Sequence, residues 1–414
     1  MKNKTSLLKE IAKKRMMIAL LMGFSSGVPL LLTSKTLQAW MVDVHVDLKI
    51  IGIFALVGLP YTLKFLWAPL MDMWAPPFLG RRRGWMLLCQ VGVIVSIIGI
   101  SFSNHKETPW VTALFALLIS FFSASQDIVV DAYRRETLSD NELGMGSTLY
   151  IYGYRVAMLL TGALALFLAD HISWFLVYLL MAASMFVGIA TTLFSPEPDV
   201  GVEPPKTLRE SVVLPFREFF KRKGAIAILL FILLYKMGDN IAGAMTMPFY
   251  LIIGFTKTEV AAIAKALGLI STLAGAFVGG VVILRLGIYR SLWIFGIMQA
   301  LSTAFFAILA QTGPENWVLA LVIGYEDFSS GMGSAALIAY SASLCNKRFT
   351  ATQYALLSSL AGVPRALFAT TTGFIAEALG WTWFFIFSAL LAIPGLLLLL
   401  YLKPQDREVP QIES

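Results

Sequence analysis

The chain has 414 residues, of which 58% are hydrophobic and 14% are charged. With a mean hydropathy of +0.76 and long apolar runs, this composition excludes a water-soluble domain and is typical of a polytopic membrane protein. The net charge of +7 does not indicate nucleic acid as a partner, because most of the basic residues lie beside the apolar runs rather than in one patch.

The apolar runs predict an all-α membrane protein. A helix needs about 20 residues to cross the hydrocarbon core, and its backbone must be hydrogen-bonded internally. On that template the sequence predicts twelve spans, six on each side of one long polar interval. The expected spans are 16–40, 50–73, 84–103, 110–136, 143–169 and 173–194, followed by 224–254, 258–286, 291–311, 317–344, 350–379 and 381–402.

The distribution of lysine and arginine predicts the orientation of these spans. If the N-terminus is cytoplasmic, 23 of the 32 basic residues fall in inside segments or at the inside ends of spans, and only Lys49, Lys106 and Lys257 fall in outside loops. By the positive-inside rule, both termini are therefore expected in the cytoplasm. The basic segment before the first apolar run is expected to be retained as part of the first span, because many further spans follow it.

The polar interval, rich in proline and mixed charge, divides the chain. It predicts an N-terminal six-helix bundle at 1–194, a cytoplasmic linker at 195–223 and a C-terminal six-helix bundle at 224–414. Two such halves are typical of the major facilitator fold, in which they rock around a site near the middle of the membrane.

The linker contains an amphipathic pattern. Leu208, Val212, Phe216 and Phe220 recur at helical spacing beside several basic residues. This pattern fits a helix that lies on a membrane surface, and it fits equally well a plain strap over the helix ends.

Ionisable side chains inside the spans are the strongest functional signal, because a charge in the hydrocarbon persists mainly where it pairs or lines a water-filled path. Acids and bases nearly balance, which favours buried pairs whose coupling could move protons. Lysines near the outer helix ends are expected to extend to the interface. The bases are Lys35, Lys64, Arg155, Lys236, Lys265 and Arg365, and the acids are Asp127, Asp131, Asp239, Glu326 and Asp327.

Asp127 and Asp131 are four residues apart, so they share one face of the fourth span. Two like charges there repel, and either a cation such as Arg155 compensates them or one of them is protonated. We expect Asp127 to couple transport to protons. Asp131, nearer the interface, is expected to be a gate or an exposed charge, and it is also a candidate for proton coupling.

The seventh span carries a second charged cluster. Lys236 and Asp239 are three residues apart, close enough for a pair on one helix, with Asn240 beside them. Because a purely structural pair could be replaced by apolar packing at little cost, a functional role is favoured. Further along the chain, Glu326 and its neighbour Asp327 are candidates for pairing with Arg365.

Other residues complete the candidate site. Tyrosines near the charges could stack on sugar faces and donate hydrogen bonds, or they could simply pack between helices; those considered for binding are Tyr154, Tyr235 and Tyr340. Lys64 is either a binding residue or a stabilising partner.

In the second inside loop Asp72 precedes an arginine cluster that begins at Arg81. A carboxylate there can pair with arginine or face the N-terminus of another helix, so these residues and Arg134 predict a latch.

Enzymatic patterns are missing where they would be expected. The sequence contains no GxxxxGK[ST] run for ATP hydrolysis, and its three histidines fall in predicted outer loops. Cys89 and Cys345 have no metal-ligand spacing and are expected to be small core residues. We therefore expect no enzyme, no metal and no cofactor.

Several motifs together resemble the AmpG-type muropeptide permeases of the major facilitator superfamily. They include SASQDIVVDAYRRETL, GYR, YKMGDN, SSGMGSAA and SLCNKRFTATQYALLSSL, and the resemblance covers nearly the whole chain. It implies proton-driven import of anhydromuropeptides across the bacterial inner membrane by a protein that we expect to be a monomer. By matching position, the implied functional residues are Gln126, Asp127, Asp131, Arg155, Lys236 and Asp239.

The sequence departs from the family in two respects, and it leaves other functions open. Many members carry further C-terminal helices, and no such helices are expected after Leu402 in this sequence. The YEDFSSGMG segment around Glu326 also differs in detail. Related members move acetyl-CoA, so a transporter of acetyl-CoA or another organic anion is one alternative. A membrane sensor that binds the same fragment without moving it is another.

Overall fold

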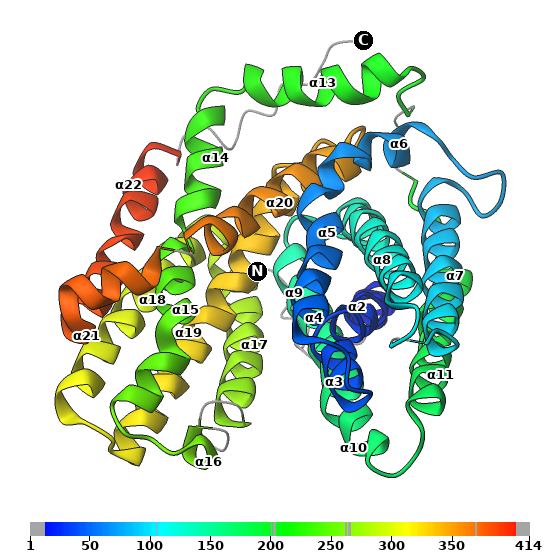
Figure 1. Cartoon of the computed structure of the whole chain (residues 1–414). Helices are drawn as coiled ribbons and strands as arrows, with labels where there is room; N and C mark the ends of the chain where they lie inside the picture. Colours follow the sequence, from blue (N-terminus) through cyan, green and yellow to red (C-terminus); the bar gives the residue numbers. More distant parts are fainter. Residues whose placement is uncertain are drawn as a thin grey trace. The chain divides into compact units, whose positions relative to one another are not determined.

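The computed structural model describes residues 13–104, 106–199, 201, 204–260, 263, 266–368 and 371–402. Throughout these ranges the regular secondary structure is helical (Figure 1). The chain divides into two compact units, which are described separately below. Unit 1 comprises 1–139, 149–215 and 345–359, and unit 2 comprises 140–148, 216–344 and 360–414.

Unit 1 is built around α7 and α8, which pack along each other. Its core includes Val93 and Ile97 of α7 and Ile119 of α8, all fully buried. The helices of this unit are α2 (Lys14–Leu32), α3 (Lys35–Asp43), α4 (Leu48–Ile53), η1 (Phe54–Gly58), α5 (Leu59–Leu63), η2 (Lys64–Leu66), α6 (Ala68–Met73), α7 (Arg81–Ser101), α8 (Pro109–Thr137), most of α9 (Leu143–Leu159), η3 (Leu160–Leu164), α10 (Ala165–Ala169), α11 (Trp174–Ser184), α12 (Phe186–Phe194) and the first turns of α13 (Leu208–Lys221) and α20 (Thr350–Phe368).

Unit 2 is built around α17, α18 and α19, of which α17 and α19 have the most extensive contact. An aromatic core lies beside them, with the rings of Phe306 and Phe385 stacked 5.0 Å apart. The remaining helices of this unit are α14 (Ala225–Leu234), α15 (Met237–Ile252), α16 (Lys257–Val260), α17 (Gly268–Leu286), α18 (Ile288–Thr312), α19 (Asn316–Ser343), α21 (Thr372–Leu390) and α22 (Ala392–Leu402), together with the start of α9 and the ends of α13 and α20.

Within the described ranges, nine helices are long and apolar enough to cross a membrane. The expected spans at 50–73, 317–344 and 350–379 are not among them. The last two are occupied mainly by α19 and by α20 with the start of α21, and α21 has a break at Gly380, whose φ of 71° is left-handed. The nine spans are Lys14–Asp43, Arg81–Ser101, Pro109–Thr137, Leu143–Ala169, Trp174–Phe194, Ala225–Ile252, Gly268–Leu286, Ile288–Thr312 and Thr372–Leu402.

Several of the expected spans are discontinuous, among them 50–73 and 224–254. The segment 50–73 consists of α4, η1, α5, η2 and α6, and Pro60 and Pro69, which lack a backbone N–H, stand near the start of the two later α-helical pieces. A second break separates α14 from α15 at Tyr235 and Lys236. Lysines stand at both breaks: Lys64 opens η2 and Lys236 precedes α15.

Glycine permits the closest helix crossing in unit 1, between α2 and α9. A Cβ atom on Gly153 would lie 1.8 Å from the carbonyl oxygen of Leu20, and one on Gly23 would lie 2.1 Å from that of Tyr150. Any larger side chain would push the two helices apart. This crossing holds the tyrosines of α9 at a fixed distance from α2.

Candidate functional site

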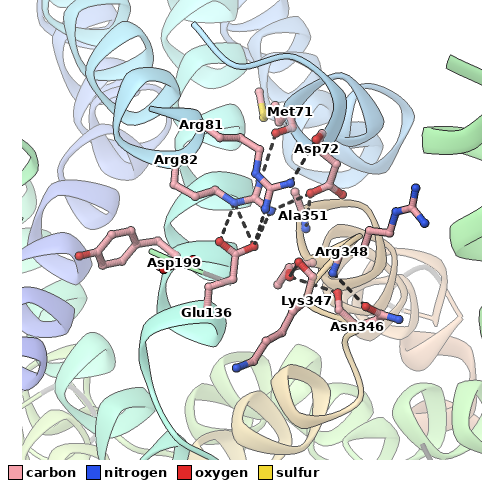
Figure 2. Close-up of polar contacts among 12 residues, drawn as sticks. Met71, Asp72, Arg81, Arg82, Glu136, Asp199, Asn346, Lys347, Arg348 and Ala351 are labelled. Atoms are coloured by element: carbon pink, nitrogen blue, oxygen red, sulfur yellow. Dashed lines mark hydrogen bonds and ion pairs between the residues drawn. The ribbon is translucent and has the colours of Figure 1, made fainter. Parts of the chain in front are cut away.

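The tightest ionic cluster in unit 1 is the Arg82 network, formed by Asp72 of α6, Arg82 of α7 and Glu136 of α8 (Figure 2). The Arg82 guanidinium, which is completely buried, donates from Nη2 to Asp72 Oδ1 at 2.8 Å and to Glu136 Oε1 at 2.6 Å. Its Nε atom donates to Glu136 Oε2 at 3.0 Å, and Nη1 donates to the Met71 carbonyl at 3.1 Å. Three helices are therefore joined by one cation.

Asp72 also caps the N-terminus of α20. Its Oδ2 atom accepts hydrogen bonds from the Thr352 backbone at 2.8 Å and the Thr352 hydroxyl at 2.7 Å, and Oδ1 accepts from the Ala351 backbone at 3.2 Å. The first backbone N–H groups of a helix lack partners within the helix and favour a negative charge. This is the arrangement that sequence analysis offered for Asp72, although Arg82 is its close partner and Arg81 lies 3.4 Å from Glu136.

The N-terminus of α7 is held by a different carboxylate. Glu197 accepts hydrogen bonds from the backbones of Arg82 at 2.7 Å and Arg83 at 3.0 Å. Gly80 precedes the helix with a φ of 84°, and a Cβ atom there would collide with the Glu197 side chain. The left-handed backbone angle and the close approach of Glu197 both require glycine at position 80.

Arg134 of α8 makes a second contact with α20, in addition to that of Asp72 on α6. Its Nη2 atom donates to Asp131 Oδ1 at 2.8 Å and to the Tyr354 hydroxyl at 3.0 Å, and its Cζ lies 4.5 Å from the centre of the Tyr150 ring. The Nε and Nη1 atoms of Arg134 are buried without a hydrogen-bond partner among the described residues. Asp131 is thus paired with the arginine three residues further along its own helix, and Tyr354 was not foreseen.

Asp127 belongs to a less completely bonded set, the Asp127 group, with Tyr61, Lys64, Ser123 and Gln126. Lys64 and Arg134 are the cations that act on Asp127, and Tyr61 lies near Asp127 and Ser123. Gln126 donates to Ser25 Oγ at 3.1 Å. Four buried oxygens here, Tyr61 Oη, Ser123 Oγ, Gln126 Oε1 and Asp127 Oδ1, have no hydrogen-bond partner in the described part of the chain.

Such orphaned polar atoms are unusual, because each typically costs about 1–3 kcal/mol when buried without a partner. A site that binds a hydroxylated ligand, a water or a proton supplies the missing partners. Arg155 and Tyr154, on α9, are half-buried and were also expected to bind substrate. Tyr154 lies near Asp127 and Arg155, which places it at the edge of the Asp127 group.

The interior of unit 2 contains the Lys236 cluster, formed by Lys236, Asp239, Ser330 and Ser334. The Lys236 ammonium donates to Ser334 Oγ at 2.8 Å and to Ser330 Oγ at 3.1 Å, and it lies 3.5 Å from Asp239 Oδ2. The expected pair on one helix is present, but it is long. Lys236 is held mainly by two hydroxyl groups of α19, which sequence analysis did not identify.

Glu326 and Asp327 accept hydrogen bonds from neighbouring helices. Ser302 of α18 donates to Glu326, and Thr272 of α17 donates to Asp327 Oδ1 at 3.2 Å. Glu326 also experiences the charges of Asp239 and Lys236, so it adjoins the Lys236 cluster. The expected pairing with Arg365 concerns a side chain outside the described part of the structure, as does every expectation for Lys265.

Tyr235 and Tyr340, the candidate tyrosines of unit 2, are packed between helices. Tyr235 is 3% exposed and donates to the Leu292 carbonyl at 3.1 Å, and Tyr340 packs edge-on against Phe231. Asn240 is half-buried beside Asp239. Among the described residues no cluster of three or more metal-ligating side chains occurs.

Long apolar helices that enclose ion pairs and unsatisfied polar groups define a multi-pass membrane protein of the transporter class. The chain belongs to the Major Facilitator Superfamily, whose family model matches residues 15–369. Members of this superfamily are transporters and not enzymes.

Similar proteins support this assignment. The chain is 46% identical over 389 residues to the anhydromuropeptide permease of Escherichia coli K12, an alignment that covers 93% of this chain and 79% of that protein. It is 42% identical to an uncharacterised protein of Haemophilus influenzae, over 97% of this chain and 98% of the relative. The solved structure of the proton:xylose symporter XylE has the same fold, with a TM-score of 0.73, 10% identity, and coverage of 95% of this chain and 96% of that one.

Proposed function

We propose that the chain imports anhydromuropeptides, N-acetylglucosamine joined to anhydro-N-acetylmuramic acid with or without a peptide, for cell-wall recycling. The observation that carries this proposal is the 46% identity, over 93% of the chain, with a protein named as an anhydromuropeptide permease. We also propose that the protein is a monomer in the bacterial inner membrane and that both of its termini lie in the cytoplasm. Its twelve spans form two six-helix bundles, 1–194 and 224–414, joined by the linker 195–223.

The proposed substrate contacts combine neutral and charged donors. Gln126, Asn240 and Tyr154 offer hydrogen bonds to the sugar hydroxyl and acetamido groups, and Arg155 and Lys236 offer positive charge to the peptide carboxylates. Support comes from the unsatisfied oxygens of the Asp127 group, which have no hydrogen-bond partner among the described residues. Lys64, Tyr235, Tyr340 and Arg365 remain candidates from sequence, with packing contacts already found for Tyr235 and Tyr340.

Proton symport is the proposed driving force, with Asp127, Asp131, Asp239 and Glu326 as candidate proton carriers. Of these four, Asp127 and Glu326 have no ion pair among the described contacts, so protonation there would break no salt bridge. Each proton that enters contributes about 2.3 kcal/mol per 100 mV of membrane potential and about 1.4 kcal/mol per unit of pH difference.

The proposed latch on the cytoplasmic side joins Asp72 and Arg134 to the first turns of α20. Both contacts lie in unit 1 and are short, at 2.8 Å from Asp72 to the Thr352 backbone and 3.0 Å from Arg134 to Tyr354. We propose that they break when the cytoplasmic side opens. Arg81 contributes to this latch through Glu136.

Uptake by proteoliposomes tests the function. Purified protein should accumulate labelled anhydromuropeptide when the pH gradient and the potential are directed inward, and should only equilibrate it without them. Unlabelled anhydromuropeptide should compete, and acetyl-CoA should not.

Each other outcome contradicts the proposal in its own way. Competition by acetyl-CoA with no muropeptide uptake would favour an organic-anion transporter. Saturable binding of the muropeptide without any uptake would favour a sensor. Accumulation that ignores the gradient would remove the proton from the mechanism.

A further inference from the structure

The linker helix α13 presents two different rows of side chains. Ser211, Pro215 and Phe219, spaced four residues apart, are buried. The adjoining row, about 100° further round the helix, consists of Val212, Phe216 and Phe220. Val212 is 37% exposed and Phe220 is 53% exposed, so this second row, the apolar flank, is not covered by the described part of the chain.

The charged residues of α13 and its ends are distributed unevenly. The acids are engaged: Glu218 pairs with Arg222 at 3.1 Å, and Glu210 lies 3.8 Å from Arg348. In the described stretch 204–223, the most exposed ionic groups are cations, namely Lys206, Arg209, Arg217, Lys221 and Lys223. The outer surface of this helix is therefore apolar along one flank and positively charged around it.

Contacts within each unit fix α13 at the ends of other helices. In unit 1, Gln353 of α20 donates to the Pro215 carbonyl at 3.2 Å, and Ser211 lies 3.9 Å from the sulfur of Met73, the last residue of α6. In unit 2, Gly224 turns the chain sharply with a φ of 82°, and α13 runs across the direction of α14 rather than along it (Figure 1). Because α14 begins an apolar span, a helix that runs across its end lies near the membrane surface.

We propose that the apolar flank of α13 inserts into the headgroup layer of the adjacent leaflet and that its cations bind anionic phospholipids. An amphipathic helix with Phe and Val on one side and Lys and Arg around them has the chemistry of an interfacial helix. The occupant is a lipid surface rather than a protein, since the most exposed charges of the described helix have the sign that anionic headgroups attract. This inference does not depend on which substrate is transported.

Spin labels on adjacent residues test the proposal. Cys89 and Cys345, both buried, are first replaced by alanine and serine, and a nitroxide is attached to Phe220→Cys on the apolar flank or to Lys221→Cys as the matched control. In proteoliposomes rich in phosphatidylglycerol, the ratio of collisions with oxygen to collisions with a water-soluble nickel chelate should be several-fold higher at 220 than at 221. The ratio at 220 should fall in phosphatidylcholine alone and in the triple variant Arg209→Gln, Arg217→Gln, Lys221→Gln.

Three results would overturn the proposal. Equal access of the nickel chelate to positions 220 and 221 would mean that the flank faces water. Exclusion of both reagents from 220 in every lipid would mean that protein covers it. Protection of 220 that increases with the protein-to-lipid ratio and ignores lipid charge would assign the flank to a second copy of the chain.

Discussion

The Arg82 network and the Asp127 group both lie in unit 1, yet their polar atoms are satisfied to different degrees. Arg82 makes hydrogen bonds from Nε, Nη1 and Nη2, and both oxygens of Asp72 accept hydrogen bonds. In the Asp127 group, four buried oxygens have no partner among the described residues. A saturated network stabilises one arrangement of helices, whereas an unsaturated group can accept a ligand or a proton without first losing a bond.

The largest effect is expected from breaking the saturated network. Arg82→Met leaves Asp72 and Glu136 buried without their cation, and removing one partner of a buried ion pair typically costs about 3–5 kcal/mol. We expect a large fall in the melting temperature of the detergent-purified protein. Arg81→Met is the matched control, because Arg81 makes only 3.4 Å contacts, and its cost should stay below about 1.5 kcal/mol. Equal losses in the two variants would contradict the assignment of Arg82.

Which of these two arginines pairs with Asp72 could not be predicted from the sequence. The run of three arginines after Asp72 predicts an ionic contact, but which one faces Asp72 depends on how α7 is rotated against α8, and packing alone decides that. Similarly, the spacing of Asp127 and Asp131 predicts one shared face, and the structure gives them different partners. The Lys236–Asp239 pair was predictable because a spacing of three within a helix is local, whereas Ser330 and Ser334 come from α19, about a hundred residues away.

The fold of the expected span 50–73 was also only partly predictable from the sequence. Its hydropathy predicts one membrane helix, and the structure has five short pieces there. Hydropathy measures the cost of transfer into lipid, and it carries little information on backbone breaks. Pro60 and Pro69 were the available signals, since proline removes a backbone donor and favours the first turn of a new helix.

A smaller effect is expected from the contact between Arg134 and Tyr354. Tyr354→Phe keeps the ring and removes one hydrogen bond to a charged group, a loss of about 1.5–3 kcal/mol. Because Tyr354 lies on α20 shortly after Cys345, which is buried, loosening of this end should speed the reaction of Cys345 with a maleimide. Cys89, buried within α7, should react no faster and serves as an internal control. An unchanged rate for Cys345 would show that this contact does not hold the start of α20.

The stability of the Asp127 group should respond little to loss of charge. Asp127→Asn retains the shape of the side chain and removes a buried charge whose Oδ1 atom has no hydrogen bond in the described structure. We expect a change in unfolding free energy within about 1 kcal/mol, measured as the melting temperature in detergent. A loss as large as that of Arg82→Met would mean that Asp127 is as fully paired as the Arg82 network.

The smallest effect concerns Glu259 on the short helix α16, which precedes the apolar span Gly268–Leu286. Hydrogen bonds from Asn316 and from the backbone and hydroxyl of Thr256 hold the pKa of this carboxyl below its usual value of 4.5. A lowered pKa in the folded state means that the ionised group stabilises the fold above pH 4.5 and that this contribution is lost as the pH falls through the lowered pKa. The melting temperatures of wild type and Glu259→Gln should therefore differ at neutral pH and converge in acid. A difference that does not vary with pH would contradict this role.

The central claim, that the unsaturated carboxylates carry the coupling proton, is tested most directly by comparing two modes of transport in Asp127→Asn. Proteoliposomes loaded with unlabelled anhydromuropeptide measure exchange of labelled substrate, and empty ones measure accumulation driven by an inward proton gradient. We expect exchange to persist in Asp127→Asn while gradient-driven accumulation is lost. Accumulation at the wild-type level would contradict it.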